Sequence, residues 1–145
     1  MPKHAKSFEI ADALHSKTIH LLRRLRLKDL ASGVGPAKLS ALSVLVFSPR
    51  PLSLAELAAA EQVKNPTMSR LVSAMEREGL VSISAAKADA RVMEIKPTKR
   101  GKRVLLAGKQ RRVSSLANAL NGLKASELAV LEQSVEILRS VIQRL

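Results

Sequence analysis

Residues 65–81 of this 145-residue chain are NPTMSRLVSAMEREGLV, and they carry helix signals at both ends. Asn65 is a strong N-cap residue, and Pro66 suits the first helical position, where its missing N–H costs nothing. Gly79 supplies the left-handed residue that commonly ends a helix. Between these ends, apolar residues recur at spacings of three and four and form one stripe: Met68, Leu71, Val72 and Met75. The stretch predicts an amphipathic helix, with the methionines as core filler, followed by a strand from about Val81.

The face opposite the stripe lacks the Glu and Lys residues that are usual on a surface helix. It carries an arginine among short side chains, and its candidate contact residues are Asn65, Pro66, Thr67, Ser69, Arg70, Ser73 and Arg77. Short hydroxyls around an arginine suit a helix pressed against base edges in a major groove. The alternative for Arg70 is a solvated surface side chain, and Arg77 could instead pair locally with Glu76 or Glu78.

The composition points to a polyanionic partner. The chain has 25 Lys and Arg against 12 Asp and Glu, a net charge of +13, which favours nucleic acid first and an anionic membrane surface second. The only aromatic residues are Phe8 and Phe47. Because single-strand and RNA binders usually stack bases on aromatic side chains, the composition favours duplex DNA.

Several other classes are disfavoured. The chain has no Cys, no phosphate-binding glycine loop and no paired carboxylates in a catalytic motif, so we expect neither an enzyme nor a cofactor. His4, His15 and His20 lack metal-ligand spacing, so no metal site is expected. No signal peptide follows Lys3, and no apolar run approaches ~18 residues, so we expect no membrane partner and a cytoplasmic location.

The order of predicted elements defines a winged helix-turn-helix. Ser53 and Glu56 form a capping box that opens a short helix, and two short helices joined by a tight turn precede a hairpin, or wing. We expect residues 1–7 to be loose. The predicted elements are helices at 8–31, 36–47, 53–60, 65–78, 99–120 and 126–144, and strands at 81–84 and 91–96. The fold class is therefore mainly α with a small β-hairpin wing.

These residues resemble the MarR family of bacterial winged-helix transcription regulators. The resemblance rests on Leu54–Ala58 for the first short helix, Asn65–Val72 for the recognition helix, Asp89-Ala90-Arg91 for the wing motif and Thr98–Gly101 for the start of the next helix. It departs at Ala90, where a basic residue is common, and at Pro97, where Leu is usual.

The resemblance implies a homodimer with two functional parts. The terminal helices, residues 1–35 and 112–145, would form a dimerisation domain, and residues 36–111 would form the DNA-binding domain. Thr67, Ser69 and Arg70 would read the major groove, while Arg91 would enter the minor groove, oriented by Asp89. A cleft lined by the first, second and fifth helices would hold a small-molecule effector, whose identity and binding residues the sequence leaves open.

Charge and periodicity agree with this division. Residues 87–112 hold ten basic and two acidic residues, whereas residues 124–145 hold three of each. Lys87, Lys99 and Arg100 are therefore added to the DNA-contact candidates. The last helix has an apolar seam, and the dimer-interface candidates are Leu14, Leu128, Leu131, Val135, Leu138, Ile142 and Leu145.

The function predicted is a sequence-specific duplex-DNA-binding regulator, a repressor released from a pseudo-palindromic operator by an effector. An activator, or a regulator without an effector, would have the same sequence features. The competing classes are a weakly specific architectural DNA-binding protein and a basic membrane-surface or protein-interaction module.

Overall fold

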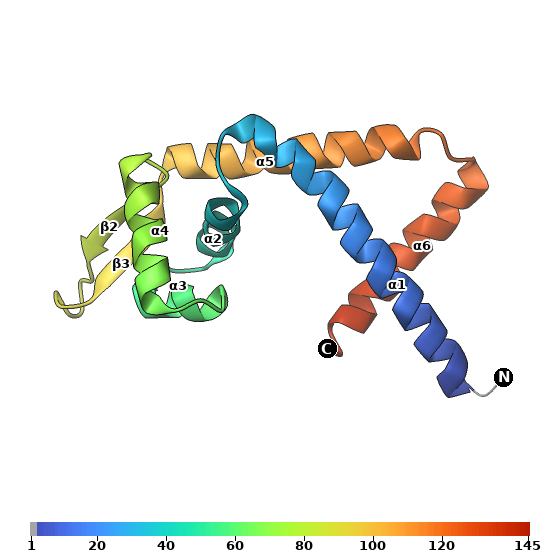
Figure 1. Cartoon of the computed structure of the whole chain (residues 1–145), viewed down its shortest axis with the longest axis horizontal. Helices are drawn as coiled ribbons and strands as arrows, with labels where there is room; N and C mark the ends of the chain where they lie inside the picture. The colour runs from blue at the N-terminus through green and yellow to red at the C-terminus, as the bar shows by residue number, and fades with distance from the viewer. Residues whose placement is uncertain (1–2) are drawn as a thin grey trace. The chain divides into compact units, whose positions relative to one another are not determined.

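The computed structural model describes residues 3–145, which form two compact units, the first ending at Arg112 and the second running from Val113 to Leu145. The element order is α1 (Lys3–Arg26), η1 (Leu27–Ser32), α2 (Pro36–Phe47), β1 (Leu52–Ser53), α3 (Leu54–Ala60), α4 (Asn65–Arg77), β2 (Val81–Ala85), β3 (Met93–Pro97), α5 (Lys99–Leu120) and α6 (Ala125–Ile142) (Figure 1). The boundary between the units falls inside α5. The mainly helical winged fold predicted from the sequence is confirmed.

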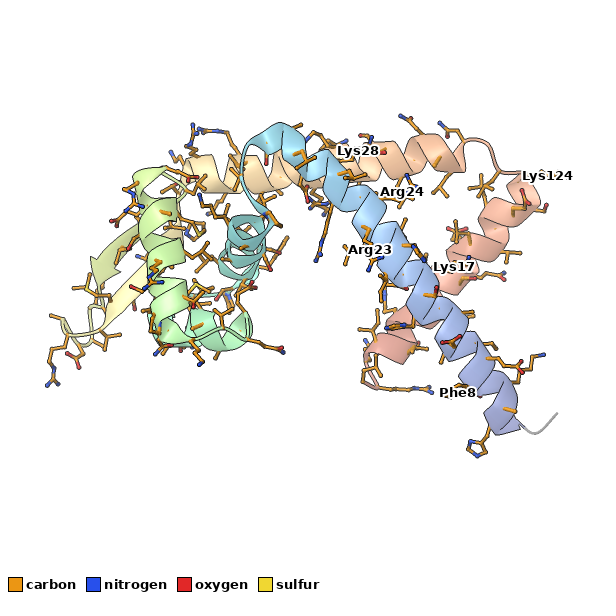
Figure 2. The ribbon with its side chains drawn as sticks, in the orientation of Figure 1. Phe8, Lys17, Arg23, Arg24, Lys28 and Lys124 are labelled. Atoms are coloured by element: carbon orange, nitrogen blue, oxygen red, sulfur yellow. The ribbon has the colours of Figure 1, made fainter. Side chains whose placement is uncertain are left out.

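The first helix starts earlier than expected. Residues 3–7, expected to be loose, are helical, and residues 1 and 2 of that segment lie outside the described residues. The segment contains Lys, His, Ala and Ser but neither Gly nor Pro between positions 3 and 7, so nothing in it opposes a helix. The side chains of Phe8, Lys17, Arg23 and Arg24 lie exposed along α1 (Figure 2). The helix continues as the 3₁₀ turn η1 and ends at Gly33, whose φ is +69°.

The helix-turn-helix agrees with the sequence in all but its cap. Helix α2 has the predicted bounds, and in the capping box of α3 the Ser53 hydroxyl accepts from the Glu56 N–H. For α4 the N-cap is Lys64, so Asn65 is the first helical residue and Pro66 the second. The prediction of Asn65 as the N-cap is therefore wrong. A proline is tolerated one position later because the first four helical N–H groups lack intrahelical partners.

The wing is part of a three-stranded antiparallel sheet of order β1-β3-β2. Ile95 in β3 is paired with Ile83 of β2 on one side and Leu52 of β1 on the other. Strand β1 was not predicted because two residues are too short to show a periodicity. Strand β3 begins at Met93 rather than Arg91, since Arg91 lies in the turn and Val92 donates to the Asp89 carbonyl over 3.0 Å.

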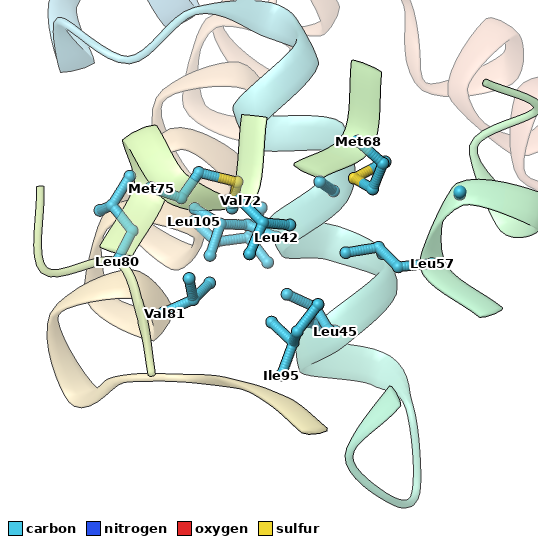
Figure 3. Packing of buried hydrophobic residues seen from close by; sticks show 12 residues of the cluster. Leu42, Leu45, Leu57, Met68, Val72, Met75, Leu80, Val81, Ile95 and Leu105 are labelled. Atoms are coloured by element: carbon cyan, nitrogen blue, oxygen red, sulfur yellow. The ribbon is translucent and has the colours of Figure 1, made fainter. Parts of the chain in front are cut away.

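The hydrophobic core lies in the first unit, between α2, α3, α4, the sheet and the start of α5 (Figure 3). Leu42, Leu57, Met68, Met75 and Ile95 are all at most 2% exposed. Both methionines come from the apolar stripe of α4, which confirms them as core filler. This packing turns the other face of α4 outward.

The end of α4 is fastened to the start of α5. Gly79 has a φ of +72°, as the sequence predicted. The Thr98 hydroxyl donates to the Gly79 carbonyl over 2.5 Å and accepts from the Gly101 N–H over 3.0 Å, while the Thr98 N–H donates to the Leu80 carbonyl. A Cβ built on Gly101 would lie 2.1 Å from the Leu80 oxygen. Only glycine allows α5 to pass this close to the backbone.

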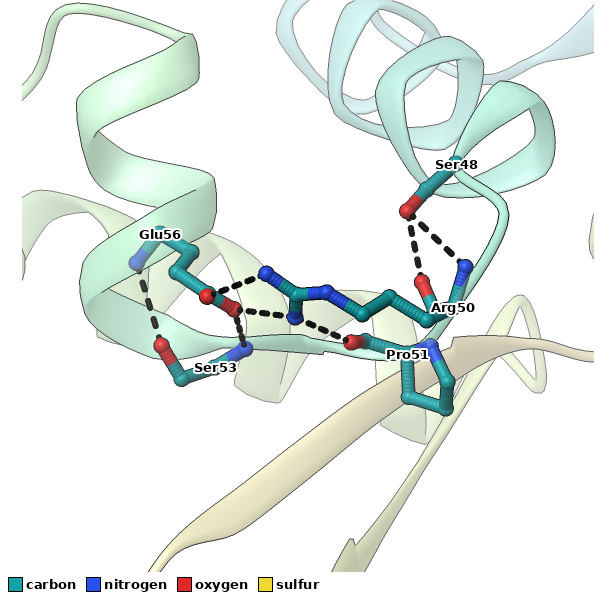
Figure 4. Close-up of polar contacts among 5 residues, drawn as sticks. All are labelled: Ser48, Arg50, Pro51, Ser53 and Glu56. Carbon is teal, nitrogen blue, oxygen red and sulfur yellow. Dashed lines mark hydrogen bonds and ion pairs between the residues drawn. The ribbon is translucent and has the colours of Figure 1, made fainter.

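An ion pair that the sequence analysis did not predict holds the loop before β1 against α3 (Figure 4). The Arg50 guanidinium donates to both carboxylate oxygens of Glu56, over 3.1 and 2.7 Å, and to the Pro51 carbonyl. Oε2 of Glu56, which lies 3.1 Å from Nη1 of Arg50, also accepts from the Ser53 N–H over 2.9 Å. Hydrogen bonds from Arg50, and then from the Ser53 backbone, lower the pKa of Glu56 to about 2.

The stabilisation from Glu56 should therefore depend on pH. A carboxylate whose pKa is depressed in the folded state stabilises the fold above its unfolded pKa, about 4.5, and loses this contribution as pH falls toward 2. We expect Glu56→Gln to lower the thermal unfolding midpoint at pH 6 and to match the parent chain near pH 2. Glu132→Gln, on the exposed surface of α6, is the matched control. An unfolding difference at Glu56 that stays constant between pH 6 and pH 2 would contradict this role.

No single helix within residues 3–145 is long and apolar enough to cross a membrane. His4–Ser32 and Pro36–Phe47 meet the length and composition criteria only when taken together, across a bend of 93°.

Candidate nucleic-acid interface

The outward face of α4 gathers all of the candidate contact residues predicted for this helix. Met68, Val72 and Met75 are buried, whereas the candidate contact residues are all exposed: Asn65, Pro66, Thr67, Ser69, Arg70, Ser73 and Arg77. Their exposure follows from the stripe, because burying one face of a helix turns the other toward solvent. The face thus carries two guanidinium groups among short hydroxyls, with the exposed carboxylate of Glu76 beside Ser69 and Ser73.

The arginines of this face are not neutralised by neighbours. Within residues 3–145, neither Arg70 nor Arg77 takes part in an ion pair. The local pairing considered for Arg77 does not form, because Glu78 pairs with Lys38 of α2 instead. That pair links α2 to the end of α4 and leaves Arg77 available.

At the wing tip, Asp89 holds Arg91. One carboxylate oxygen of Asp89 accepts from the backbone N–H and from Nε of Arg91, over 3.0 and 3.1 Å, and the other accepts from Nη2 over 3.3 Å. The hydrogen bond from the Arg91 side chain, followed by that from its backbone, lowers the pKa of Asp89. The Arg91 side chain is nevertheless 92% exposed. An exposed ion pair contributes only ~0–1 kcal/mol, so the guanidinium can exchange Asp89 for a phosphate.

The first turns of α4 and α5 contain no acidic residue. Acidic side chains stabilise the positive end of a helix dipole, and α3 and α6 place Glu56 and Glu127 there. Helix α5 instead begins with Lys99 and Arg100, both exposed, and Lys87 is exposed in the wing. Cations at a helix N-terminus are unfavourable for the isolated helix. They concentrate positive potential, which suits an anionic partner.

Among residues 3–145, no three His, Asp or Glu side chains gather in a way that could hold a metal ion. The candidate interface therefore has three parts, all in the first unit. They are the exposed face of α4 with its arginines and hydroxyls, the wing tip with Arg91, and the basic first turn of α5. These features define a winged helix-turn-helix DNA-binding protein, the class in which a recognition helix and a wing contact the duplex together.

Comparisons with known proteins show which family of regulators the chain resembles. Residues 32–92 match the model described as the MarR family. An HTH-type transcriptional regulator of Mycobacterium bovis is 26% identical over 133 residues, covering 92% of each chain. A putative transcriptional regulator of Pseudomonas aeruginosa is 25% identical and has a TM-score of 0.82, with 95% of this chain and 96% of that chain covered. A MarR family protein of Bacillus stearothermophilus, 24% identical, has a TM-score of 0.80 over 99% of both chains. Residues 32–92 of this chain are thus similar to the MarR family, and the protein is a DNA-binding transcription regulator.

Proposed function

We propose that the protein acts in the cytoplasm as a homodimeric repressor on a pseudo-palindromic duplex operator. Residues 36–111 would bind DNA, and residues 1–35 and 112–145 would form the dimerisation domain. Two features joined in one chain carry the proposal. Helix α4 presents arginines on its exposed face, and α5 connects its unit to α6, a helix with no buried residue.

The apolar surface of α6 supports dimerisation. Leu128 and Leu131 are each 39% exposed, Val135 is 55% exposed and Ile142 is 66% exposed. These residues, with the half-buried Leu138 and the terminal Leu145, recur at the spacing of a helix-packing seam. In α1, Leu14 is 37% exposed. An apolar surface of this kind marks an interface, and a second copy is the partner available to every chain.

The DNA contacts follow from the candidate interface. We infer that Thr67, Ser69 and Arg70 contact base edges in the major groove, flanked by Asn65, Pro66, Ser73 and Arg77. Arg91 would enter the minor groove when it exchanges Asp89 for the DNA, and Lys87, Lys99 and Arg100 would contact phosphates. A Staphylococcus aureus MepR variant bound to an oligodeoxyribonucleotide shares the fold, with a TM-score of 0.72 over 92% of this chain and 97% of that chain at 17% identity. That likeness supports DNA as the ligand.

Regulation by an effector completes the proposal. A small molecule that binds the DNA-free state more tightly than the DNA-bound state would release the operator. Its identity would follow from the genes that the operator controls.

Salt dependence tests the DNA-contact part of the proposal. Because the contacts displace counterions, the logarithm of duplex affinity should fall linearly with the logarithm of salt concentration, with a slope of about −0.9 per phosphate contacted. Fluorescence anisotropy with a labelled duplex measures this slope. Anionic vesicles are the comparison, and tight vesicle binding at physiological salt without duplex binding would contradict the proposal.

Breaking the α6 seam should separate the dimer. Leu131→Asp places a charge in the interface, and we expect the dissociation constant of the dimer to rise about 30-fold or more, as for a central interface residue. Sedimentation equilibrium measures the change, and operator affinity should fall with it. Gln133→Asp, also exposed on α6 but off the seam, is the control. A dimer unaffected by Leu131→Asp would place the interface elsewhere.

A further inference from the structure

Three charged side chains meet where η1 approaches α5. A Cβ built on Gly108 of α5 would lie 3.4 Å from Nη1 of Arg112, 3.6 Å from Oδ1 of Asp29 and 3.7 Å from Nη2 of Arg111. Beside Gly108, one carboxylate from η1 therefore lies close to two guanidinium groups from α5. None of these residues is among the proposed DNA contacts.

The Asp29 carboxylate pairs with Arg112 and not with Arg111. Asp29 accepts a hydrogen bond from Nη1 of Arg112, and the pair is partly buried, with side-chain exposures of 14% for Asp29 and 27% for Arg112. Nε of Arg111 donates to the Lys28 carbonyl over 3.3 Å. Nη2 of Arg111 is enclosed, and within residues 3–145 it has no hydrogen-bond partner. At this contact between η1 and α5, called the joint below, the Arg112 guanidinium donates to the Asp29 carboxylate, whereas Nη2 of Arg111 has no hydrogen-bond acceptor among the described residues.

Buried apolar side chains of η1 do not add to this polar contact with α5. No residue of η1 is buried, and Leu27 and Leu30 are 58% and 77% exposed. The polar cluster is therefore the main contact described between η1 and α5. Asp29 is its only anion.

We propose that Asp29 is a positioning residue for DNA binding. It holds α5 against η1 through its ion pair with Arg112, and Arg111 is a reserve partner that can replace Arg112. The contact so fixes the direction in which α5 leaves the proposed DNA-binding domain, residues 36–111. This inference rests on the proposed function, because α5 is the covalent route from each recognition helix to the proposed dimerisation domain. A fixed α5 sets the distance between the two recognition helices, and hence the half-site spacing that the dimer accepts.

Because Arg111 can replace Arg112, loss of Asp29 and loss of Arg112 should have unequal effects on the contact. Removing the Asp29 charge leaves two partly buried cations without an anionic partner, so they repel each other and η1 separates from α5. Removing Arg112 frees Asp29 for the unsatisfied Nη2 of Arg111, so the joint closes again. A simple two-membered ion pair would instead respond equally to loss of either member.

The first arm of the test uses the full-length protein without DNA. The variants are Asp29→Asn, Arg112→Gln, Arg111→Gln and the double variant Arg111→Gln/Arg112→Gln. We expect hydrogen exchange of residues 27–33 to accelerate about tenfold or more in Asp29→Asn and in the double variant, and less than about threefold in either single arginine variant. Because the double variant keeps Asp29, it tests the joint even if Asp29→Asn does not fold.

The second arm measures half-site spacing. Each variant is titrated with the duplex selected by the parent protein and with duplexes whose half-sites are one base pair closer or farther apart. The preference for the parent spacing should fall about threefold or more in Asp29→Asn and in the double variant, and stay within about twofold in the single arginine variants. A loss of stability alone would lower all affinities together and leave this preference unchanged.

The outcomes separate the two claims. Equal effects of Asp29→Asn and Arg112→Gln, or no effect of any variant on exchange, would overturn the reserve-partner arrangement. If the parent protein selects a palindromic duplex but the spacing preference is the same in every folded variant, the positioning role is wrong and the proposed function stands. If the parent protein selects no palindromic duplex, the proposed function fails and the role of Asp29 in DNA binding fails with it.

Discussion

Replacing Gly101 with valine should prevent stable folding of the DNA-binding unit, and alanine should destabilise it by about 1–3 kcal/mol or more. The reason is the 2.1 Å separation between a Cβ at this position and the Leu80 carbonyl oxygen. Because the obstacle is backbone rather than a flexible side chain, α5 must move. That movement also breaks the hydrogen bonds by which Thr98 joins α5 to the end of α4. Circular dichroism during urea unfolding measures the loss.

The matched control is Gly35→Ala. Gly35 has a φ of −66°, and a Cβ there would have nothing within 4 Å. Alanine should therefore change the stability by less than about 1 kcal/mol, because the lower entropy of the unfolded chain offsets the weaker preference for alanine at this N-cap position. If Gly101→Ala were as stable as the parent chain, the close approach of α5 to Leu80 would be wrong.

Replacing Arg70 with alanine should cost about 1–3 kcal/mol of binding free energy at the preferred operator, and the discrimination among sequences should fall with it. Arg70 lies on the exposed face of a helix whose opposite face is locked into the core, and it has no ion-pair partner within the described residues. Its loss should leave stability unchanged. Competition binding with the operator and with single-base variants measures both quantities.

Lys99→Ala is the matched comparison. Lys99 is also exposed and basic, but it is proposed to contact a phosphate, so its loss should weaken binding to all duplexes alike and reduce the salt slope by about 1. If Arg70→Ala behaved like Lys99→Ala, the assignment of α4 as the base-reading helix would be wrong.

The elements that the sequence predicts well are those with local signals. Helix α2 is bounded by Gly35-Pro36 and a Pro-Arg-Pro sequence, α3 by its capping box, and the exit from α4 by Gly79. The stripe of α4 predicts which of its residues are buried, and therefore which are exposed for DNA. The Asp89–Arg91 pair lies within three residues, so its contact could be expected from the sequence.

The features that the sequence does not predict depend on contacts between distant residues. Strand β1 has two residues and exists because β3 offers it a free edge. The Arg50–Glu56 pair needs the loop before β1 to fold back on α3, and the Lys38–Glu78 pair spans forty positions. Asp29 meets Arg112 only because the fold brings together η1 and α5, and the two residues are 83 positions apart in the sequence. Among the local errors, the cap of α4 reflects the freedom of proline to occupy the first or second helical position.

Selection of binding sites from random duplex DNA by the full-length protein tests the central claim most directly. We predict recovery of a pseudo-palindromic sequence whose half-site centres lie about one helical turn apart, bound by one dimer. Recovery of unrelated sequences, bound as tightly as the starting pool, would contradict sequence-specific regulation and favour an architectural DNA-binding protein instead.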